Sequence, residues 1–489
     1  MMEDQTETKS DNLVGNHGRS AIVQLFEWTF VDIQAECVLH LGPTGFGAVQ
    51  VSPVNEVRIL PNRSWRERYE PISYKILGRS GAEMQLRSMV KTCNAAGVRI
   101  YVEVVLNSMA GGTGSVQGTG GSVAYPSYRD YPDASYGIGD FNHPCTVLNQ
   151  SDPHQVRNCQ IDELPDLNQG LTSVRRRIVD FLNKLISMGV AGFYIHAARN
   201  MWPHDLKAIY SQLENLSTTA GFSSRSRPFI YQDVMDLRSE ETFRKEYVLL
   251  GMTTEYRFAY DIGAIIFKQK PFHWMVNLGT KIGYIPREHS VIFLDDPVLQ
   301  RIPNVDDLPK IVTFKHRRLY SIALVFMLGH RYGTPRIMSS YNFNNRNEGL
   351  PSDTRGKISP VTLDAEGQCT GGWICEHRWK IVASMMRFRT EVSWQSVISW
   401  VDNGQNQLAF CRGKAGFIAI NAEISLSMKA NVFTCMKAGI YCDIISGKVD
   451  GTKCSGIAVT VNDDGRADIF ISSRANEPFV VLLASEKLP

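Results

Sequence analysis

The sequence predicts an α/β protein whose main domain is an eight-stranded (β/α)8 barrel. Short apolar runs, most of them ending in polar residues, recur along the first 300 residues, and helical patterns separate them. Strands that alternate with helices favour a parallel sheet with crossover connections. Because the runs are almost continuously apolar, both faces of that sheet are expected to be buried. The runs lie at 21–28, 47–53, 99–107, 192–197, 229–234 and 290–296.

Two of the intervening segments have clear helical spacing. The first is expected to be capped by Thr172 or Ser173 and to stop at Gly189. Pro203, a residue favoured in the first turn of a helix, opens the second. The apolar faces are expected to contain Val174, Ile178, Phe181, Leu182 and Leu185 in the first helix, and Leu206, Ile209, Leu213 and Leu216 in the second.

The pattern changes at two places along the chain. Residues 108–170 are rich in Gly, Ser, Tyr and Pro, and the stretch is too long for a plain loop, so we expect a small domain inserted after the third strand. From about residue 394, short strands and turns predict an antiparallel β-sandwich or barrel, of which we expect the sandwich. The expected organisation is a polar tail at 1–19, a barrel at 20–107 and 171–393, the insert at 108–170 and the sandwich at 394–489.

Composition excludes several classes of function. The chain of 489 residues has a formal net charge of +3, which is too small to indicate a nucleic-acid partner. It contains no run of 18 apolar residues, so no membrane-spanning helix is expected. We also expect the protein to be a monomer. Ten cysteines favour an oxidising compartment, and hence a secreted protein, although residues 1–19 lack the apolar core of a signal peptide.

Seven in-order stretches resemble animal α-amylases, and the resemblance extends from about Ser20 to the C-terminus. They are 25–28 (LFEW), 45–53, 67–74, 97–102, 332–333, 338–341 and 375–379. The resemblance implies a barrel with an inserted domain and a C-terminal β-domain, and hydrolysis of 1,4-α-glucosidic bonds. It also implies disulfide bonds between Cys37 and Cys93, Cys145 and Cys159, Cys369 and Cys375, and Cys442 and Cys454. Cys411 and Cys435 lie outside that pattern and either form a fifth bridge or stay free.

The residues at the family's catalytic positions differ from those the reaction needs. Two carboxyl groups flank the glycosidic bond, one attacking the sugar and the other protonating the leaving oxygen. By the resemblance, His196 stands at the position of the attacking aspartate, Asp233 at that of the proton-donating glutamate, and Val298 at that of a third aspartate. An imidazole cannot form the glycosyl ester, and Asp233 withdraws its carboxyl group by one methylene. We therefore expect the amylase activity to be lost.

The family's sugar-binding surface is expected to be partly kept. Trp65 and Tyr69 match aromatic residues that stack on glucose rings, whereas Arg66 replaces a neighbouring tryptophan. Packing of these rings within the protein is an equally good interpretation. A stretch at 302–309 with two prolines replaces the family's Gly-rich loop after the seventh strand.

Two ion sites follow from the same resemblance. Asn107, Asp166 and the carbonyl oxygen of Arg157 match the calcium site, and Asn200 replaces a histidine that contributes a carbonyl oxygen. Oxygen ligands of this kind suit calcium. The chloride site has one matching ligand, Arg336, but Tyr194 replaces an arginine and Asp296 an asparagine. Because a carboxylate repels an anion, we expect Asp296 to pair with Arg336 and chloride binding to be lost.

Three functions follow from these observations. The first is a catalytically inactive α-amylase-like protein that binds an α-glucan or a protein partner through the former active-site cleft. The second is an α-glucan hydrolase with residual or altered activity, in which Asp233 acts with Asp295, Asp296 or Glu103 as a relocated carboxyl pair. The third is a structural or interaction scaffold with no sugar ligand.

Overall fold

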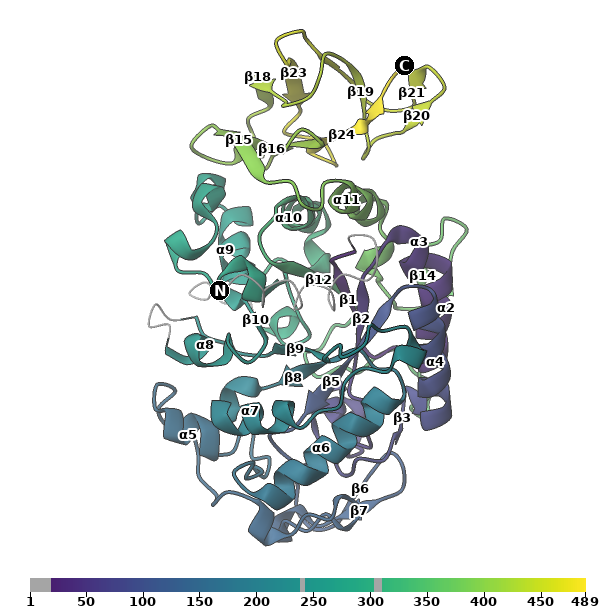
Figure 1. The fold of residues 1–489 in the computed structure, drawn as a ribbon, viewed down its shortest axis with the longest axis vertical. Coiled ribbons are helices and arrows are strands. Elements are labelled where there is room, and N and C mark those ends of the chain that lie inside the picture. Colours follow the sequence, from purple (N-terminus) through teal and green to yellow (C-terminus); the bar gives the residue numbers. More distant parts are fainter. Residues whose placement is uncertain (1–18, 238–241, 303–309) are drawn as a thin grey trace. The chain divides into compact units, whose positions relative to one another are not determined.

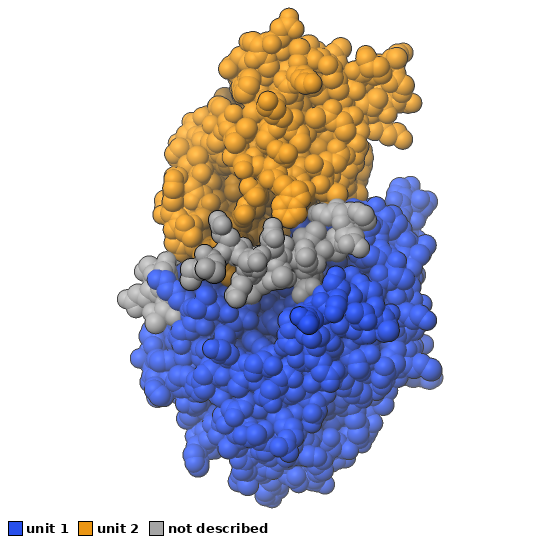
Figure 2. All heavy atoms as spheres, viewed as in Figure 1, with its two compact units in different colours: residues 1–254, 339–375 blue, residues 255–338, 376–489 orange. Residues whose placement is uncertain are grey.

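The computed structural model describes residues 19–237, 242–302 and 310–489. The expected N-terminal tail, apart from its last residue, and the proline-containing stretch at 303–309 lie outside the described residues. Two compact units are distinguished (Figure 2), and each is described by itself. Unit 1 comprises residues 1–254 and 339–375, and unit 2 comprises residues 255–338 and 376–489.

Eight strands form a closed barrel, which confirms the predicted fold class. Neighbouring strands follow the order β1-β12-β11-β10-β9-β8-β5-β2. The pairs are parallel, as between β5 and β8 and between β8 and β9. The strands are β1 (Ile22–Leu25), β2 (Ala48–Val51), β5 (Arg99–Val105), β8 (Gly192–His196), β9 (Phe229–Gln232), β10 (Met252–Thr254), β11 (Ser290–Ile292) and β12 (Thr334–Ser339).

Six of these strands coincide with the apolar runs of the sequence, and β10 and β12 do not. β10 contains three residues, two of them threonine, and β12 contains Pro335 and Arg336. Both are buried along their whole length, but neither has an uninterrupted apolar run. A short or polar strand in the interior of a barrel therefore leaves little periodic signal.

Helices connect the strands within each unit, and Figure 1 shows α2 and α4 beside one another in unit 1. The first predicted helix is α6, but its N-cap is Leu171, without a side-chain cap, so the expected capping by Thr172 or Ser173 is wrong. Pro203 does open α7, which ends at Ser211, so Leu213 and Leu216 are buried beyond the helix rather than on it. The helices are α2 (Phe30–Glu36), α3 (Gly42–Thr44), α4 (Glu83–Ala95), α5 (Pro153–Asn158), α6 (Thr172–Ser187), α7 (Pro203–Ser211), α8 (Thr242–Tyr247), α9 (Tyr256–Ile266), α10 (Arg317–Gly329) and α11 (Lys380–Glu391).

Residues 108–170 contain little regular structure. Their elements are the two-stranded sheet of β6 (Val116–Gln117) and β7 (Val123–Ala124), three single 3-10 turns and helix α5. The end of this stretch lies beside the residue that leaves β5, because the Leu167 nitrogen donates a hydrogen bond to the carbonyl oxygen of Asn107 over 2.8 Å. Two further small sheets in unit 1 pair β3 (Leu77–Gly78) with β4 (Gly81–Ala82) and β13 (Thr362–Leu363) with β14 (Cys369–Thr370).

The C-terminal part of unit 2 is an antiparallel all-β domain, as predicted. A six-stranded sheet in the order β15-β16-β17-β24-β19-β22 accompanies the pair β18-β23 and the pair β20-β21. Its core consists of alternating apolar residues, among them Phe417, Val432, Ile469 and Leu482. The strands are β15 (Val397–Asp402), β16 (Gln407–Arg412), β17 (Gly416–Asn421), β18 (Met428–Phe433), β19 (Gly439–Asp443), β20 (Val449–Asp450), β21 (Lys453–Cys454), β22 (Ala458–Val461), β23 (Arg466–Ile471) and β24 (Phe479–Lys487).

All ten cysteines form disulfide bonds. The four pairs implied by the resemblance are present, and Cys411 and Cys435 form the fifth. Among the described residues, no helix is both long enough and apolar enough to cross a membrane.

Candidate functional site

His196 is the last residue of β8, at the carboxyl end of the barrel strand. The pairing places His196 beside Val105 of β5. A β-carbon at Gly192, the first residue of the strand, would collide with the carbonyl oxygen of Phe229 in β9, so only glycine allows this close approach. Immediately after His196 the chain turns, because Ala197 adopts the left-handed conformation with φ of 50°. The strand therefore ends with the imidazole at the position where barrel proteins place functional side chains.

The imidazole of His196 is held by a buried carboxylate and by an aromatic ring. Its Nδ1 lies 3.3 Å from Oε1 of Glu103, a side chain of β5 that is 2% exposed. The His196 ring stacks on Tyr69, with centroids 4.4 Å apart and an angle of 29° between the planes. Glu103 in turn accepts a hydrogen bond from the Gln50 side chain over 3.0 Å, and the Tyr231 hydroxyl donates to Gln50 over 2.6 Å. Four strands of the barrel thus contribute to one polar network.

Asp233 follows directly after β9 and is held by the turn after His196. Its Oδ2 accepts a hydrogen bond from the backbone nitrogen of Ala197 over 3.3 Å. The Asp233 nitrogen donates to the carbonyl oxygen of Ile195 over 3.0 Å, and its carbonyl oxygen accepts from the Arg199 nitrogen over 3.1 Å. The structure therefore brings the turns that carry His196 and Asp233 together.

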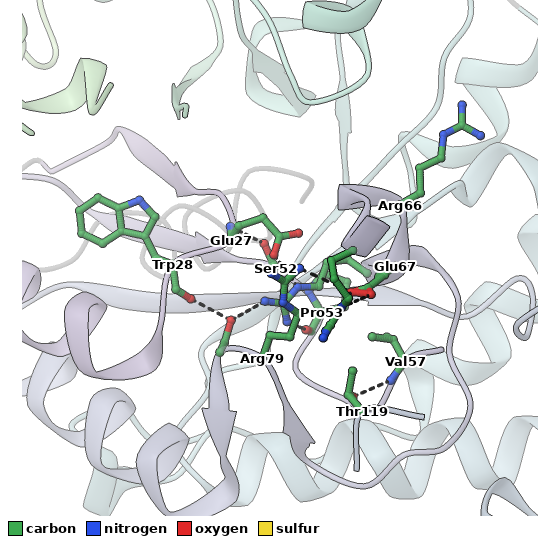
Figure 3. A network of polar contacts seen from close by, with 12 residues as sticks. Glu27, Trp28, Ser52, Pro53, Val57, Arg66, Glu67, Arg79 and Thr119 are labelled. Carbon is green, nitrogen blue, oxygen red and sulfur yellow. Dashed lines mark hydrogen bonds and ion pairs between the residues drawn. The ribbon is translucent and has the colours of Figure 1, made fainter. Parts of the chain in front are cut away.

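Trp65, Arg66 and Tyr69 belong to one 3-10 helical segment, Trp65–Tyr69, but their surroundings differ. Trp65 is 6% exposed, and its indole nitrogen donates to the carbonyl oxygen of Arg346 over 2.9 Å. Tyr69 meets Trp65 edge-on, while one face lies against His196. Arg66 extends away from the network below it (Figure 3), and its guanidinium lies 3.5 Å from Asp162. Of the two candidate stacking rings, Trp65 is thus largely packed within the protein.

A buried ion pair anchors this 3-10 segment. Arg68 donates to Oε2 of Glu27 over 2.8 Å, and both side chains are almost fully buried. Arg68 also donates to the Ser80 hydroxyl over 2.7 Å, and that hydroxyl donates to the Trp28 carbonyl oxygen over 2.8 Å. Glu27, two residues beyond β1, has a φ of 70°. The sequence reasoning missed this pair, because neither residue lies in a pattern that marks a partner.

Four further candidate residues lie in unit 2: Asp295, Asp296, Val298 and Arg336. Val298 is 47% exposed, and its nitrogen donates to Oδ1 of Asp296 over 2.9 Å. Asp296 also accepts from the Tyr256 hydroxyl over 3.3 Å, and its Oδ2 lies 4.0 Å from Nη2 of Arg336, at the limit of an ion pair. Asp295 is buried, and burial raises its pKa to about 7, although hydrogen bonds from Gln300 and Tyr320 oppose that shift. These two carboxyl groups are engaged in internal hydrogen bonds.

Tyr194, the remaining candidate from the chloride-site comparison, lies in unit 1. It is 4% exposed, and its ring packs against Tyr231 with centroids 4.8 Å apart. Tyr194 therefore contributes an aromatic ring to the barrel interior.

Asn107 and Asp166 have the properties of cation ligands. Asp166 is 1% exposed; its Oδ2 accepts from the Asn142 amide over 2.7 Å, while its Oδ1 has no hydrogen-bond partner among the described residues. The side-chain oxygen of Asn107 is also buried and, within the same described ranges, has no partner. Burial raises the pKa of Asp166 to about 7, although the side chains of Asn142 and Asn107 oppose that shift. Buried oxygens without partners are costly, and a hard cation would satisfy them, so these residues fit calcium.

The other two candidate ligands lie close to each other in unit 1. Arg157 is in α5, and Asn200 ends the 3-10 turn Ala198–Asn200 that follows β8. The Asn200 side chain donates to the Val156 carbonyl oxygen over 2.9 Å, so it ties this turn to α5. Across the described ranges, no group of three His, Cys, Asp or Glu residues could hold a metal, and a cation here would need amide and carbonyl oxygens.

A calcium ion held by Asp166 would bind more weakly as the pH falls below about 7. At pH 5 the folded, metal-free protein keeps a proton on Asp166 that the unfolded chain has released, so its stability falls as the pH rises from about 4 to 7. Calcium favours the carboxylate and must displace this proton. Between pH 5 and pH 7 we expect the Kd to fall about tenfold per pH unit, as measured by isothermal titration calorimetry. Any binding left in Asp166→Asn should lose this dependence, and a Kd that does not change with pH in the unchanged chain would contradict the assignment.

The C-terminal domain and the barrel together define the class of protein. Residues 397–485 match the family described as alpha amylase, C-terminal all-beta domain. Together with the closed parallel barrel, this domain defines a barrel protein of the amylase type.

Relatives that cover almost the whole chain then identify the family. An alpha-amylase of Tenebrio molitor is 42% identical over 471 residues, which are 96% of this chain and 98% of that protein. An alpha-amylase-related protein of Drosophila willistoni is 41% identical over 96% of this chain and 94% of that protein. A solved structure of a variant of alpha-amylase I from Eisenia fetida, in complex with maltohexaose, has a TM-score of 0.90 and 36% identity, covering 96% and 98% of the two chains. The chain therefore belongs to the α-amylase family of glycoside hydrolases.

Proposed function

We propose that this member of the α-amylase family binds α-glucan chains without hydrolysing them. The observation that carries the proposal is the placement of His196, which is paired with the buried Glu103 and stacked on Tyr69. By the resemblance, this is where the attacking carboxylate and its sugar would meet. An imidazole fixed at that point supplies no carboxylate and occupies one face of the ring that would otherwise support the sugar.

The other two catalytic positions support the same proposal. Asp233 retains a carboxyl group, but the side chain is one methylene shorter than glutamate, and a displacement of about 1 Å can cost on the order of a hundredfold in rate. Val298 offers neither charge nor a hydrogen bond from its side chain. The carboxyl groups of Glu103, Asp295 and Asp296 are engaged with neighbouring side chains or backbone nitrogens, which does not favour a relocated catalytic pair.

Binding of α-glucan is supported by similarity and by the residues that remain. The Eisenia fetida alpha-amylase I variant, whose structure matches 96% of this chain, is in complex with maltohexaose. Arg66, with a side chain that is 43% exposed, and Tyr69 offer a guanidinium fork and an aromatic ring on one 3-10 segment. Donors of this kind can bind sugar hydroxyls, and a ring edge can pack against a sugar.

The unchanged chain is expected to bind maltoheptaose and to release no product from it. Binding is measured by isothermal titration calorimetry, and hydrolysis by chromatography after long incubation with starch and a blocked maltooligosaccharide. Arg66→Ala should weaken binding, whereas Lys448→Ala in the C-terminal domain, which changes an exposed cation far along the chain, should not. Product formation that disappears in Asp233→Asn would show that the protein is a hydrolase and would overturn the proposal.

A scaffold without a sugar ligand is the second candidate function. It is favoured by the burial of Trp65 and by the coverage of one Tyr69 face, because the site then offers little free aromatic surface. Failure of the unchanged chain and of His196→Ala to bind any maltooligosaccharide would favour this function. Binding by His196→Ala alone would instead identify the imidazole as the group that blocks the site.

We further infer that the protein binds calcium, does not require chloride and acts in an oxidising compartment. The buried oxygens of Asn107 and Asp166 support calcium, with Arg157 and Asn200 contributing main-chain carbonyl oxygens. The carboxylate of Asp296, 4.0 Å from Arg336, supplies a negative charge at the chloride position. Five disulfide bonds are typical of secreted proteins.

A further inference from the structure

Helix α8 contacts two separate segments of unit 1 through adjacent residues, Glu246 and Tyr247. Glu246 accepts two hydrogen bonds from Arg157 of α5, and Tyr247 donates to main-chain oxygens of the turn that follows β8. These two segments carry Arg157 and Asn200, the residues proposed to give calcium their main-chain carbonyl oxygens. α8 itself makes no direct contribution to that proposed ligand set.

The side chain of Arg157 is buried, with 2% exposure, and has contacts on several sides. Its two terminal nitrogens donate to the two Glu246 oxygens over 3.1 and 2.8 Å, a bidentate arrangement that sets orientation as well as distance. The guanidinium also lies over three aromatic rings, with its carbon 4.9 Å from the centroid of Trp202, 5.1 Å from that of Phe243 and 5.6 Å from that of Tyr247. Rotation of this side chain would lose all of these contacts, so the Arg157 backbone is held with it.

Tyr247 holds the other segment at the two residues that flank Asn200. Its hydroxyl donates to the carbonyl oxygen of Met201 over 2.7 Å and to that of Arg199 over 3.2 Å. Tyr247 is fully buried, and burial raises its pKa, so the hydroxyl stays protonated and donates across the physiological range. The main chain on both sides of Asn200 is therefore tied to α8.

We propose that Glu246 and Tyr247 are positioning residues for calcium, because together they fix the spacing between the main-chain carbonyl groups of Arg157 and Asn200. The inference rests on the proposed calcium site. Calcium takes oxygen ligands at about 2.3–2.6 Å, and groups that orient its ligands typically affect affinity about 10–100-fold. Coupling is reciprocal, so calcium should also stabilise α8.

The ligand atom at position 157 is a main-chain oxygen, which makes a sharp test possible. Arg157→Met and Glu246→Gln each remove the ion pair but leave that oxygen in place. In the full chain, each is expected to raise the calcium Kd about 10–100-fold in calorimetric titration with calcium chloride after treatment with EGTA. The double variant should have a calcium Kd no higher than that of the single variant with the higher Kd, because both changes remove the same contact. Tyr247→Phe should raise the Kd independently.

Arg175→Met provides the matched control. Arg175 forms an ion pair with Asp205 over 2.9 Å in the same unit, and its side chain is partly buried. This variant is expected to keep the calcium Kd within about twofold of that of the unchanged chain, although it loses an ion pair of similar length.

A second readout separates positioning from general stability. In the unchanged chain, calcium should slow hydrogen exchange of the α8 amides and raise Tm, whereas in Glu246→Gln both responses should shrink even if the metal-free Tm is unaltered. Equal calcium Kd values in Glu246→Gln, Arg157→Met and the unchanged chain would overturn the positioning role while leaving the calcium site intact. Absence of calcium binding in the unchanged chain would overturn both.

Discussion

The triple variant His196→Asp, Asp233→Glu, Val298→Asp is expected to hydrolyse a blocked maltooligosaccharide on the order of 10³-fold faster than the unchanged chain. It restores an attacking carboxylate, a proton donor of full length and a third carboxylate, and a single well-placed acid or base contributes about 10²–10⁴-fold. The change also removes the imidazole from the face of Tyr69. Release of the chromophore under steady-state conditions measures the effect.

The controls for this variant distinguish lost chemistry from a lost binding site. Each single reversion should remain near the background, because catalytic groups that act as a unit are strongly non-additive. A triple variant that binds maltoheptaose but releases no product would indicate that changes beyond the three positions also prevent the reaction. Turnover by the unchanged chain equal to that of the triple variant would refute the proposed loss of activity.

Arg68→Met is expected to lower the free energy of unfolding by about 3–5 kcal/mol. The substitution leaves the carboxylate of Glu27 buried without its cation, and breaking a buried ion pair at one partner typically has this cost. The side chains of Arg68 and Glu27 are 2% and 1% exposed. Urea denaturation followed by fluorescence measures the loss, and binding of maltoheptaose should weaken too, because Arg68 anchors the 3-10 segment that carries Arg66 and Tyr69.

An exposed ion pair provides the comparison. Arg87 and Glu83 lie 2.8 Å apart on α4, with side chains that are 48% and 35% exposed. Arg87→Met is expected to cost about 0–1 kcal/mol, since water already screens the pair. Similar losses in the two variants would mean that the Arg68–Glu27 pair does not stabilise the fold. Glu27→Gln combined with Arg68→Met should lose less free energy of unfolding than Arg68→Met alone, because residue 27 then no longer carries an unpaired buried charge.

The barrel and the β-domain were predictable because hydrophobic periodicity reports burial directly. Six of the eight barrel strands and the α6 and α7 helices leave such a pattern. β10 and β12 do not, since a closed barrel buries even threonine and arginine by surrounding them with other strands. The N-terminus of α6 was placed to within one or two residues, but its cap was wrong, because residue propensity indicates which side chain suits a cap without fixing the backbone geometry there.

The sequence predicted which residues belong to the candidate site, but it did not predict which side chains they contact. His196 and Asp233 could be located from the strand pattern and the family resemblance. Glu103 was recognisable only as one of several acidic residues near strand ends, and the β5–β8 register made it the partner of His196. Trp65 was equally compatible with sugar stacking and with packing until its 6% exposure was known.

The amino-acid sequence alone determined the family, the order of the strands that carry the apolar runs, the four disulfide pairs implied by resemblance and the chemical type of each residue at the catalytic positions. These properties depend on residue type and on spacing along the chain. The tertiary structure decided which carboxylate holds His196, which oxygens of Asn107 and Asp166 have no hydrogen-bond partner among the described residues, and how α8 connects the segments of Arg157 and Asn200. Such contacts join residues far apart in sequence, and only the folded backbone determines the distances between them.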